Sequence, residues 1–472
     1  MSDPSRGDRG GGVIFFMMRN IAIIPGGPTG TQAAVAVGRV NSPTGSADVR
    51  RRNLSLVLRH IAAHGPCART ELAEATGLVS GSITALTAEL IAGGLVHEVG
   101  LASSGARGRP RRLLELAPGR VLTIAIEVTP AQLISAATDL GGTVLWRDER
   151  THGARFGDPR PVAAGIARIV HEAQGRVRGG SRGDRGEAET PGLEATTAHS
   201  TYTAHSAHLA RVVITVPGAV VEDEVVADSI LLGWRRVDLR GLVRAEDPSV
   251  NCPISVVNES NMAAFAEYRA LVERTGSAPR VFAYLRVVRT GIGGGLVVDG
   301  SVHTGGHGMA GEFGHIPVHF DGPGCKCGDR GCLVTYLGLR ALLSAAGMEP
   351  EQYGPDLEAG RLEFDRRLRR GDPAAVRALE TGARALATAL TAISRVADPE
   401  RVVLGGHLAA WSDWLVPNVL RHLAGRRAVT PTDEPVISTD LLGEDATLQG
   451  ALRYGCETVL DDPTSVPLPA GS

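Results

Sequence analysis

The sequence predicts an α/β protein in which a small winged helix-turn-helix precedes a larger domain of alternating strands and helices. Between residues 50 and 92, apolar residues recur at helical spacing in three short segments, and a basic hairpin follows them. From Val121 onward, short apolar strands alternate with longer helices, which is typical of α/β architecture. The chain has 472 residues, enough for about two to four domains.

The composition excludes several classes of protein. The net charge is -2, so the chain as a whole is not a polycationic nucleic-acid binder, and six cysteines are too few for a disulfide scaffold. Residues 1–48 are rich in Gly, Pro, Ser and Thr and predict a disordered leader. We find neither the roughly 20 apolar residues of a membrane span nor a signal-peptide pattern, so we expect a cytoplasmic protein with no membrane partner.

The predicted winged helix-turn-helix covers residues 49–118. Gly65-Pro66 ends the first helix, Gly77 ends the second, and Ser80 or Ser82 can cap the third. The expected elements are helices over 53–63, 70–76 and 80–91, and strands over 95–99 and 113–116 that flank a basic tip at 105–112.

The charge of this module indicates DNA binding. Residues 50–120 hold ten Arg and five Glu, a local charge of +5. In a winged helix the third helix enters the major groove. The side chains expected to face DNA are Ser80, Ser82, Thr84 and Thr87 on that helix, and Arg107 and Arg109 on the hairpin tip. The alternatives are a protein-interaction module or a solvated basic loop.

The larger domain is expected to span residues 119–462, followed by a tail at 463–472. Gly141-Gly142 predicts a hairpin turn, and the polar, low-complexity residues 178–208 predict a disordered insertion. We expect strands over 121–126, 133–139, 212–216, 254–257, 281–288, 296–298 and 402–404, and helices over 160–177, from Asn261 onward, and over 374–396.

A cysteine cluster predicts a metal site. Cys325, Cys327 and Cys332 supply three thiolates, and His315 can complete a tetrahedral, structural Zn²⁺ site that pins the loop carrying Glu312. Rival fourth ligands are His303, His307 and His319. The alternative, three reduced core cysteines, fits poorly because the segment is polar and rich in glycine.

These residues carry a family resemblance. Gly308-Met-Ala-Gly-Glu312-Phe-Gly-His315-Ile and Cys325-x-Cys327-Gly-x-x-Gly-Cys332-Leu together resemble the signature of the ROK family of repressors and sugar kinases. Further similar stretches are Val216-Pro-Gly218-Ala-Val, Leu232-Gly-Trp234, Gly291–Gly295 and Asp398–Gly406. The winged helix ahead of them resembles the repressor branch.

The resemblance implies an actin-like, hexokinase-type fold, in which two ribonuclease-H-like lobes close on a sugar, and a homodimer or homotetramer. It implies sugar contacts from Asn258, Glu259, Glu312 and His315, with Glu259 where kinases carry their catalytic base. It also implies nucleotide-side glycine turns at Gly291, Gly293, Gly294, Gly405 and Gly406.

The sequence departs from the kinase pattern at three places. Glu127-Val-Thr-Pro130 replaces a glycine-rich phosphate turn, and β-branched residues and proline resist the backbone geometry that cradles phosphates. Glu259 replaces an Asp, and a displacement near 1 Å can cost about a hundredfold in rate. Val334 replaces a Glu that accepts a sugar hydroxyl in relatives.

Each polar residue also has a plain structural interpretation. Asn258 and Asn261 can cap a helix, Glu259 can be an exposed charge at the helix start, and Glu312 can be a surface carboxylate. The leading hypothesis is a non-catalytic, sugar-responsive transcriptional regulator, a repressor in particular, with operator DNA and a sugar or sugar phosphate as partners. The second is an active ATP-dependent sugar kinase with a DNA-binding extension. The third is a ligand-free, constitutive repressor.

Overall fold

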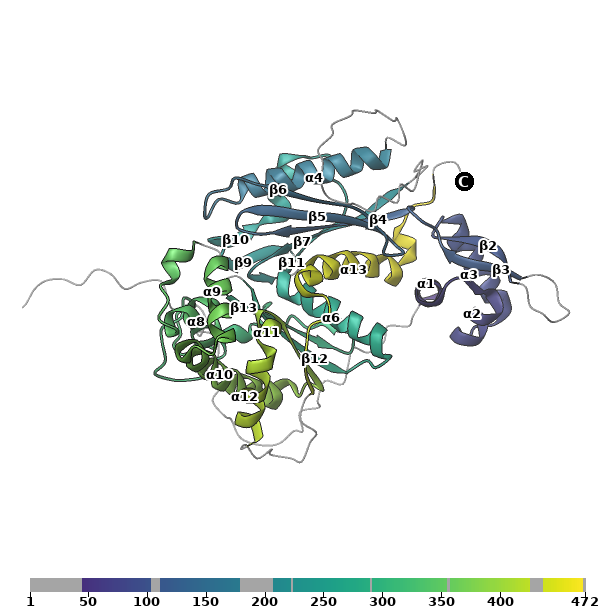
Figure 1. Cartoon of the computed structure of the whole chain (residues 1–472). Helices are drawn as coiled ribbons and strands as arrows, with labels where there is room; N and C mark the ends of the chain where they lie inside the picture. The colour runs from purple at the N-terminus through teal and green to yellow at the C-terminus, as the bar shows by residue number, and fades with distance from the viewer. Residues whose placement is uncertain are drawn as a thin grey trace, which may run out of the picture.

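The structure, a computed structural model, describes residues 45–102, 111–178, 207–221, 224–288, 291–354, 357–424 and 436–469. They form a small module beside a two-lobed body (Figure 1). The predicted leader up to residue 44 and the interior of the predicted 178–208 insertion lie outside the described residues, so these two predictions are not tested.

The small module is the predicted winged helix-turn-helix. Its three strands form one sheet in the order β1-β3-β2. The sequence did not predict β1, because two residues are too short to show a period. Helix α1 starts inside the predicted leader. The elements are α1 (Ser46–His64), β1 (Cys67–Ala68), α2 (Arg69–Thr76), α3 (Ser80–Ala92), β2 (Val96–Ala102) and β3 (Arg111–Leu116).

Helices α2 and α3 have the geometry of a helix-turn-helix. They are bent by 116° across three residues, of which Gly77 has a φ of +70°. Such pairs typically cross at about 90–120° over a short glycine-containing turn. Among the described residues, no single helix is long and apolar enough to cross a membrane. Helices α2 and α3 reach that length and apolar composition only when they are taken together.

The first lobe is built on a five-stranded sheet in the order β11-β7-β4-β5-β6. Strands β4, β5 and β6 are antiparallel, and β7 and β11 run parallel to β4. A smaller sheet, β10-β9-β8, lies beside it. The elements are β4 (Val121–Val128), β5 (Gln132–Asp139), β6 (Val144–Thr151), α4 (Arg160–Arg178), β7 (His208–Val216), β8 (Ala219–Val221), β9 (Val225–Ser229), β10 (Trp234–Asp238), α5 (Leu239–Glu246) and β11 (Ile254–Asn258).

The second lobe repeats this topology. Its sheet has the order β14-β13-β12-β15-β16, again with three antiparallel strands followed by two parallel ones. The strands are β12 (Val281–Val288), β13 (Gly291–Val298), β14 (Ser301–Val302), β15 (Arg401–Gly406) and β16 (Val436–Thr439). Two such sheets define a pair of ribonuclease-H-like lobes, so the expected actin-like fold is confirmed.

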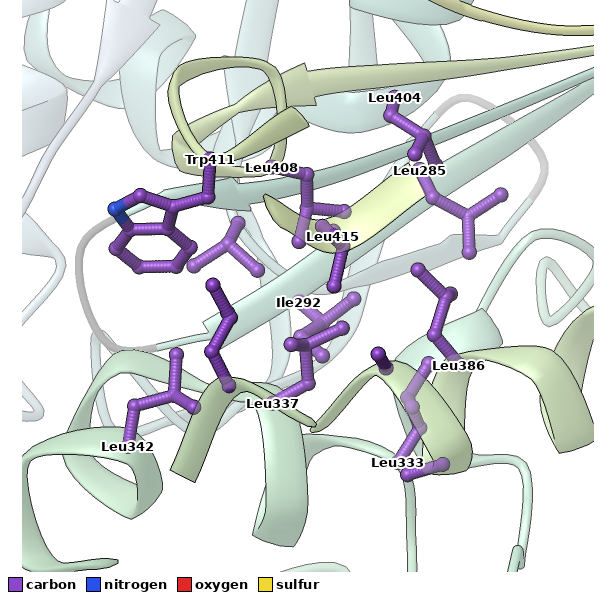
Figure 2. Close-up of a cluster of buried hydrophobic side chains, with 14 of the residues drawn as sticks. Leu285, Ile292, Leu333, Leu337, Leu342, Leu386, Leu404, Leu408, Trp411 and Leu415 are labelled. Atoms are coloured by element: carbon purple, nitrogen blue, oxygen red, sulfur yellow. The ribbon is translucent and has the colours of Figure 1, made fainter. Parts of the chain in front are cut away.

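Helices cover the outer face of the second sheet. Leu285 and Leu404 point from the sheet toward Leu337 and Leu386 of the helical layer, and Trp411 closes one end of this core (Figure 2). The helices are α7 (Val334–Leu337), α8 (Leu339–Ala345), α9 (Glu358–Arg369), α10 (Pro373–Ala397), α11 (His407–Ala410) and α12 (Ser412–Ala424), with short 3-10 turns at η1 (Phe313–His315) and η2 (Pro350–Tyr353).

The predicted glycine turn at Gly291–Gly295 is wrong, because these residues form the first part of β13. Their lack of side chains serves packing. A Cβ on Gly293 would overlap Ser260 Oγ, and a Cβ on Gly295 would lie 2.6 Å from the Cβ of Ala264. The glycines therefore let a helix lie directly on the strand.

Two long helices, α6 (Glu259–Thr275) and α13 (Ala446–Asp461), lie between the two sheets (Figure 1). Helix α13 packs on α6 and on β4 and β7, while α6 packs on β12 and β13. Close approach again depends on glycine, because a Cβ on Gly450 would overlap the backbone of Met262, and one on Gly455 would overlap Thr123. Thus α13 contacts the first sheet and α6 along its length.

The winged module is docked on the body by a shared apolar core. Leu54 and Leu58 of α1 belong to the same buried cluster as Val121 of β4 and Val459 of α13. Val466 joins it, so the predicted tail from residue 463 packs in part against the module, through η4 (Pro463–Ser465). Only four residues, 117–120, connect β3 to β4. The module is therefore held by packing as well as by the chain connection.

Candidate functional site

The candidate ligand site is built around the start of α6, where β11 ends. Asn258 caps this helix, since its Oδ1 accepts hydrogen bonds from the backbone N–H groups of Ser260 (2.8 Å) and Asn261 (2.9 Å). Its Nδ2 donates to the carbonyl of Gly218 at 2.8 Å. The helix-cap interpretation of Asn258 is confirmed, and the second Nδ2 hydrogen is the group that it can offer to a ligand.

Glu259, the next residue, is buried. Its carboxylate pairs with Arg286 of β12 at 3.6 Å, and only 10% of the Glu259 side chain and 5% of the Arg286 side chain are exposed. The guanidinium also donates to Ser260 Oγ at 3.4 Å. The interpretation of Glu259 as an exposed charge is therefore wrong, because this carboxylate belongs to a buried ion pair between α6 and the second sheet.

Glu312 lies close to Glu259. The pKa of Glu312 is raised above its usual range, because burial disfavours the carboxylate and the negative charge of Glu259 adds to that effect. The residue is half-buried, and the short turn η1 follows it directly. The interpretation of Glu312 as a plain surface carboxylate is therefore wrong, because the residue is half-buried and the charge of Glu259 acts on it.

The cysteine cluster forms as predicted. The ligand atoms of His315, Cys325, Cys327 and Cys332 all lie within 4.8 Å of one another. Cys327 Sγ is 3.6 Å from Cys332 Sγ, and Cys325 Sγ is 3.6 Å from His315 Nδ1. Two thiolates about 2.3 Å from one tetrahedral ion would be about 3.8 Å apart, so this donor set fits a metal ion.

His315, rather than a neighbouring histidine, belongs to this cluster. Among the described residues the group contains none of the rival ligands, His303, His307 and His319. The backbone supports the arrangement at Gly331, where φ is +66° and a Cβ would overlap the carbonyl oxygen of His319. Only two residues separate Glu312 from His315, so the cluster fixes the segment that carries both.

The turn that follows β4 has no free backbone donor. Thr129 N–H donates to Gln132 O at 3.0 Å, and Pro130 has no N–H. The N–H groups of Ala131 (3.4 Å) and Gln132 (3.0 Å) donate to Thr129 Oγ1. All four positions are accounted for within the turn, so it cannot cradle a phosphate in this conformation.

The predicted nucleotide-side glycines of the second lobe are also engaged. Gly405 and Gly406 end β15, where a Cβ on Gly405 would overlap the buried hydroxyl of Tyr284. Gly406 has a φ of +60°, and its N–H donates to Asp440 Oδ2 at 3.1 Å. Packing and internal hydrogen bonding thus account for these glycines without a nucleotide.

Two further features delimit the site. Val334 begins α7 and packs against the apolar core of the second lobe, so it supplies no polar group. A cavity of about 370 Å³ lies at the opposite end of β7, lined among others by His208 and Cys252. It shares no residue with the group around Glu259.

The exposed face of α3 is the candidate DNA-binding surface. Val79, not Ser80 or Ser82, is the N-cap residue, and no side chain caps the helix. Ser80 and Thr84 are exposed and Ser82 is half-buried. The first amides of α3 therefore have no side-chain acceptor, and such amides commonly bind backbone phosphates in DNA complexes.

The prediction that Thr87 faces DNA is wrong. Thr87 is fully buried, because its hydroxyl donates to the carbonyl of Ile83 at 2.8 Å and accepts from Arg69 Nε at 3.1 Å. Thr87 follows Ile83 by about one helical turn and lies on the same buried face of α3. Arg107 and Arg109 lie outside the described residues.

Much of the positive charge of the module is locally neutralised. Arg50 pairs with Glu89, and Arg69 and Arg112 both pair with Glu98. The count of +5 is a property of the sequence, but these arginines are held by carboxylates of the same module. The count of +5 already subtracts these carboxylates, so the pairs change where positive charge lies on this surface and not the net charge of the module.

Sequence reasoning missed a charged bridge between the module and the body. Glu457 of α13 accepts from Arg59 of α1 at 2.5 Å, and its other carboxylate oxygen pairs with Arg269 of α6. Arg59 also pairs with Asp461 at 2.6 Å. Partners almost 400 residues apart leave no local pattern, so no signal in the sequence could have joined them.

A second bridge reaches the end of the candidate recognition helix. Arg120, just before β4, donates to the carbonyl of Gly93 at 3.3 Å and to the carbonyl of Pro467 at 2.5 Å. Gly93 directly follows α3, and Pro467 belongs to the C-terminal segment. The module is thus fixed to the body at both α1 and α3.

Two ribonuclease-H-like lobes, acidic residues between them and a docked winged helix define a sugar-kinase-like body joined to a helix-turn-helix module. The sequence profile of the ROK family matches residues 186–454, more than half of the chain. The chain belongs to the ROK family.

Relatives of this chain include both repressors and kinases. A putative xylose repressor of Caldicellulosiruptor sp. (strain Rt8B.4) is 25% identical over 434 residues, covering 89% of this chain and 98% of the relative. A kanosamine kinase of Amycolatopsis mediterranei (strain S699) is 35% identical over 222 residues, 46% of this chain and 67% of the kinase. The crystal structure of a ROK family transcriptional regulator, a homologue of the E. coli MLC protein, superposes with a TM-score of 0.68 at 22% identity, covering 89% of this chain and 99% of that one.

Proposed function

We propose that this protein is a DNA-binding transcriptional repressor of carbohydrate metabolism whose ROK domain senses a sugar. The xylose-repressor relative aligns along nearly the whole chain, winged module included. The kinase relative aligns with less than half of it. The combination of a DNA-binding fold with a sugar-kinase fold supports regulation by a small molecule.

The observation that carries the proposal is the bridge at Glu457. This residue contacts α1 of the module through Arg59 and contacts α6 through Arg269. Helix α6 begins at the candidate sugar site, where Asn258 caps it and Glu259 is its first residue. A sugar that shifts α6 therefore changes the support of the module, and the affinity for operator DNA changes with it.

The sugar contacts are proposed to come from Asn258, Glu259, Glu312 and His315. A structural Zn²⁺ held by His315 and the three cysteines would fix the loop that presents Glu312. With Nδ1 of His315 on the metal, Nε2 is the nitrogen that remains for a sugar hydroxyl.

DNA recognition is assigned to α3 and the hairpin tip. Ser80, Ser82 and Thr84 are the proposed groove contacts, with Arg107 and Arg109 on the tip. Two modules in a homodimer or homotetramer would bind half-sites about one helical turn apart. Analytical ultracentrifugation with operator DNA tests that stoichiometry.

A catalytic role as a sugar kinase is the second candidate. Glu259 retains a carboxylate, and the kanosamine kinase relative favours phosphoryl transfer. Against it, the Thr129 turn uses all its own donors, and Glu259 is paired with Arg286. Phosphoryl transfer depends on positioning and on charge stabilisation of the phosphates, so both features oppose it.

The deciding experiment measures operator binding by the purified chain at physiological salt, with and without each sugar of a panel. Selection from fragments of the parent genome identifies the operator, and fluorescence anisotropy gives the affinity. One sugar is expected to change the affinity by about 5- to 150-fold. Absence of sequence-selective binding would refute the proposal, and ATP turnover above that of Glu259→Gln would favour the kinase.

A further inference from the structure

The three thiols of the cysteine cluster differ in their exposure to water. Cys332 is fully buried, Cys325 is half-buried and Cys327 is exposed. The residue after Cys332 fixes it to the body, because the N–H of Leu333 donates to the carbonyl of Ile316 at 3.0 Å and Leu333 belongs to the apolar core of the second lobe. One thiol of the cluster is therefore anchored, and another is open to small solutes.

The exposed thiol lies in a turn next to the anchored one. The N–H of Gly328 donates to the carbonyl of Cys325 at 3.1 Å, and φ is +102° at Gly328 and +66° at Gly331. Four residues separate Cys327 from Cys332, and their Sγ atoms are 3.6 Å apart. A disulfide bond is about 2.05 Å long, so a movement of about 1.5 Å would join the two sulfur atoms. Glycine on both sides of the turn lets the backbone follow that movement.

The other two members of the cluster form a second pair. Cys325 Sγ is 3.6 Å from His315 Nδ1, so its nearest described partner is a ring nitrogen rather than a thiol of the same exposure as Cys327. A bound Zn²⁺ would hold all three sulfur atoms as thiolates, which are the reactive form of cysteine. Exposure and distance together therefore single out Cys327 and Cys332 for reaction with an oxidant in solution.

We propose that Cys327 is a site of oxidation by hydroperoxides and that it forms a reversible disulfide with Cys332, which disables the metal cluster. The Cys327 thiolate attacks one oxygen of hydrogen peroxide, the O–O bond breaks, and a sulfenic acid forms while hydroxide leaves and takes up a proton. The Cys332 thiolate then attacks that sulfur, the S–S bond forms, and a second hydroxide leaves as water. Two thiolates lose two electrons, and one peroxide is reduced to two molecules of water.

The disulfide removes two of the four donors of the cluster. His315 and Cys325 remain, and two ligands do not make the closed tetrahedral site in which proteins hold structural Zn²⁺. Only two residues separate His315 from Glu312, so loss of the metal frees the segment that carries both. The affinity for a sugar should fall as a result. This last step alone rests on the proposed function, in taking a sugar as the ligand.

The test treats the full chain, loaded with Zn²⁺, with hydrogen peroxide. A chromogenic chelator reports release of Zn²⁺, and mass spectrometry of a tryptic digest without reductant reports the disulfide. The digest distinguishes every pairing, because trypsin cleaves after Lys326 and Arg330 and so places each cysteine of the cluster on a separate peptide. Calorimetric titration compares the reduced and oxidised chains for the sugar of the panel that binds the reduced chain most tightly.

Peroxide is expected to release the Zn²⁺ of the cluster and to link peptide 327–330 to peptide 331–340. Dithiothreitol with added Zn²⁺ should reverse both changes, since a disulfide is reducible. The oxidised chain should bind the sugar about 10- to 100-fold more weakly, the scale of one hydrogen bond to a charged group.

Two serine variants form a matched pair. Cys327→Ser and Cys325→Ser each remove one thiolate of the cluster, but only the first removes the exposed thiol. Cys325→Ser should still form the disulfide between Cys327 and Cys332, and Cys327→Ser should be the slower of the two to lose thiols to peroxide. Cys456→Ala removes a buried thiol outside the cluster and should oxidise as the wild type does.

Three results would overturn the proposal: full retention of Zn²⁺ after peroxide, a main disulfide that includes Cys325, and a sulfinic acid on Cys327 in place of a disulfide. If a serine variant is insoluble, the wild-type digest and Zn²⁺ release decide the question. A sugar affinity that survives complete oxidation would refute the step from the cluster to the sugar site. The Zn²⁺ and disulfide measurements use neither DNA nor sugar, so loss of operator binding would refute the proposed function and leave this inference standing.

Discussion

Replacement of Glu457 by glutamine should uncouple the winged module from the sugar site. The variant keeps the shape of the side chain and removes its charge. The Glu457 side chain is 14% exposed, whereas Arg59 and Arg269 are 34% and 27% exposed. Fully exposed pairs contribute about 0–1 kcal/mol and buried charged hydrogen bonds about 1.5–3 kcal/mol, so each of these partly buried contacts is worth about 1 kcal/mol.

The expected loss is therefore about 2 kcal/mol in the contacts that join α1, α13 and α6. That is comparable with a typical coupling free energy of about 1–3 kcal/mol between two ligand sites. When the sugar is added, the operator affinity of the wild type should change about 5- to 150-fold, as expected for such coupling. In Glu457→Gln that factor should fall toward one, while calorimetry shows the affinity for the sugar itself within about threefold of the wild type.

Glu273→Gln is the matched control. Glu273 pairs with Arg453 across the same two helices, α6 and α13, and among the described residues no ion pair joins either side chain to the module. It removes an ion pair of the same type and is expected to leave the response to the sugar unchanged. If Glu457→Gln keeps the full response, or if Glu273→Gln loses as much of it, the bridge is not the route of coupling.

Three further outcomes follow from the site. Cys332→Ser should lower the content of bound zinc, measured by atomic emission, and the melting temperature, because it removes the most buried member of the cluster. Gly293→Ala places a methyl group on Ser260 Oγ and should cost about 1–3 kcal/mol in denaturant unfolding. The pKa of Glu312 is raised in the folded protein, so the native state binds this proton more tightly than the unfolded one, and stability falls as the pH rises through the native pKa. Glu312→Gln should therefore have a higher melting temperature than the wild type at pH 8, with a smaller difference at pH 4. A lower melting temperature than the wild type at pH 8 would contradict the assignment.

The sequence predicted the elements that depend on local pattern. Helices α2 and α3, strand Val281–Val288 and the long helix near residues 374–396 were found within one residue of their ends, whereas the start of α1 was placed seven residues too late. The cysteine cluster was predicted with His315 as its fourth member, although ligand chemistry alone left three other histidines open. These features follow from periodicity, turn residues and donor chemistry, and each of these signals comes from residues that are close together in the sequence.

The features that failed depend on tertiary packing. Gly291–Gly295 was interpreted as a turn, although a helix packed on a strand also demands residues without side chains. Thr87 was placed on the exposed face of α3, but Arg69 from the neighbouring helix holds its hydroxyl inside. The charge of Arg286 within an otherwise apolar strand was the one available sign of a buried ion pair.

The turn at Thr129 and the buried pair of Glu259 with Arg286 both bear on nucleotide binding. A protein that binds a nucleotide can balance its acidic residues with the metal ion that accompanies the phosphates. Here the Thr129 turn keeps its own donors occupied, and Glu259 is already paired with Arg286. Because α6 carries Glu259 at its start and Arg269 further along, a ligand that engages the first acts on the helix that supports α13 and the DNA-binding module.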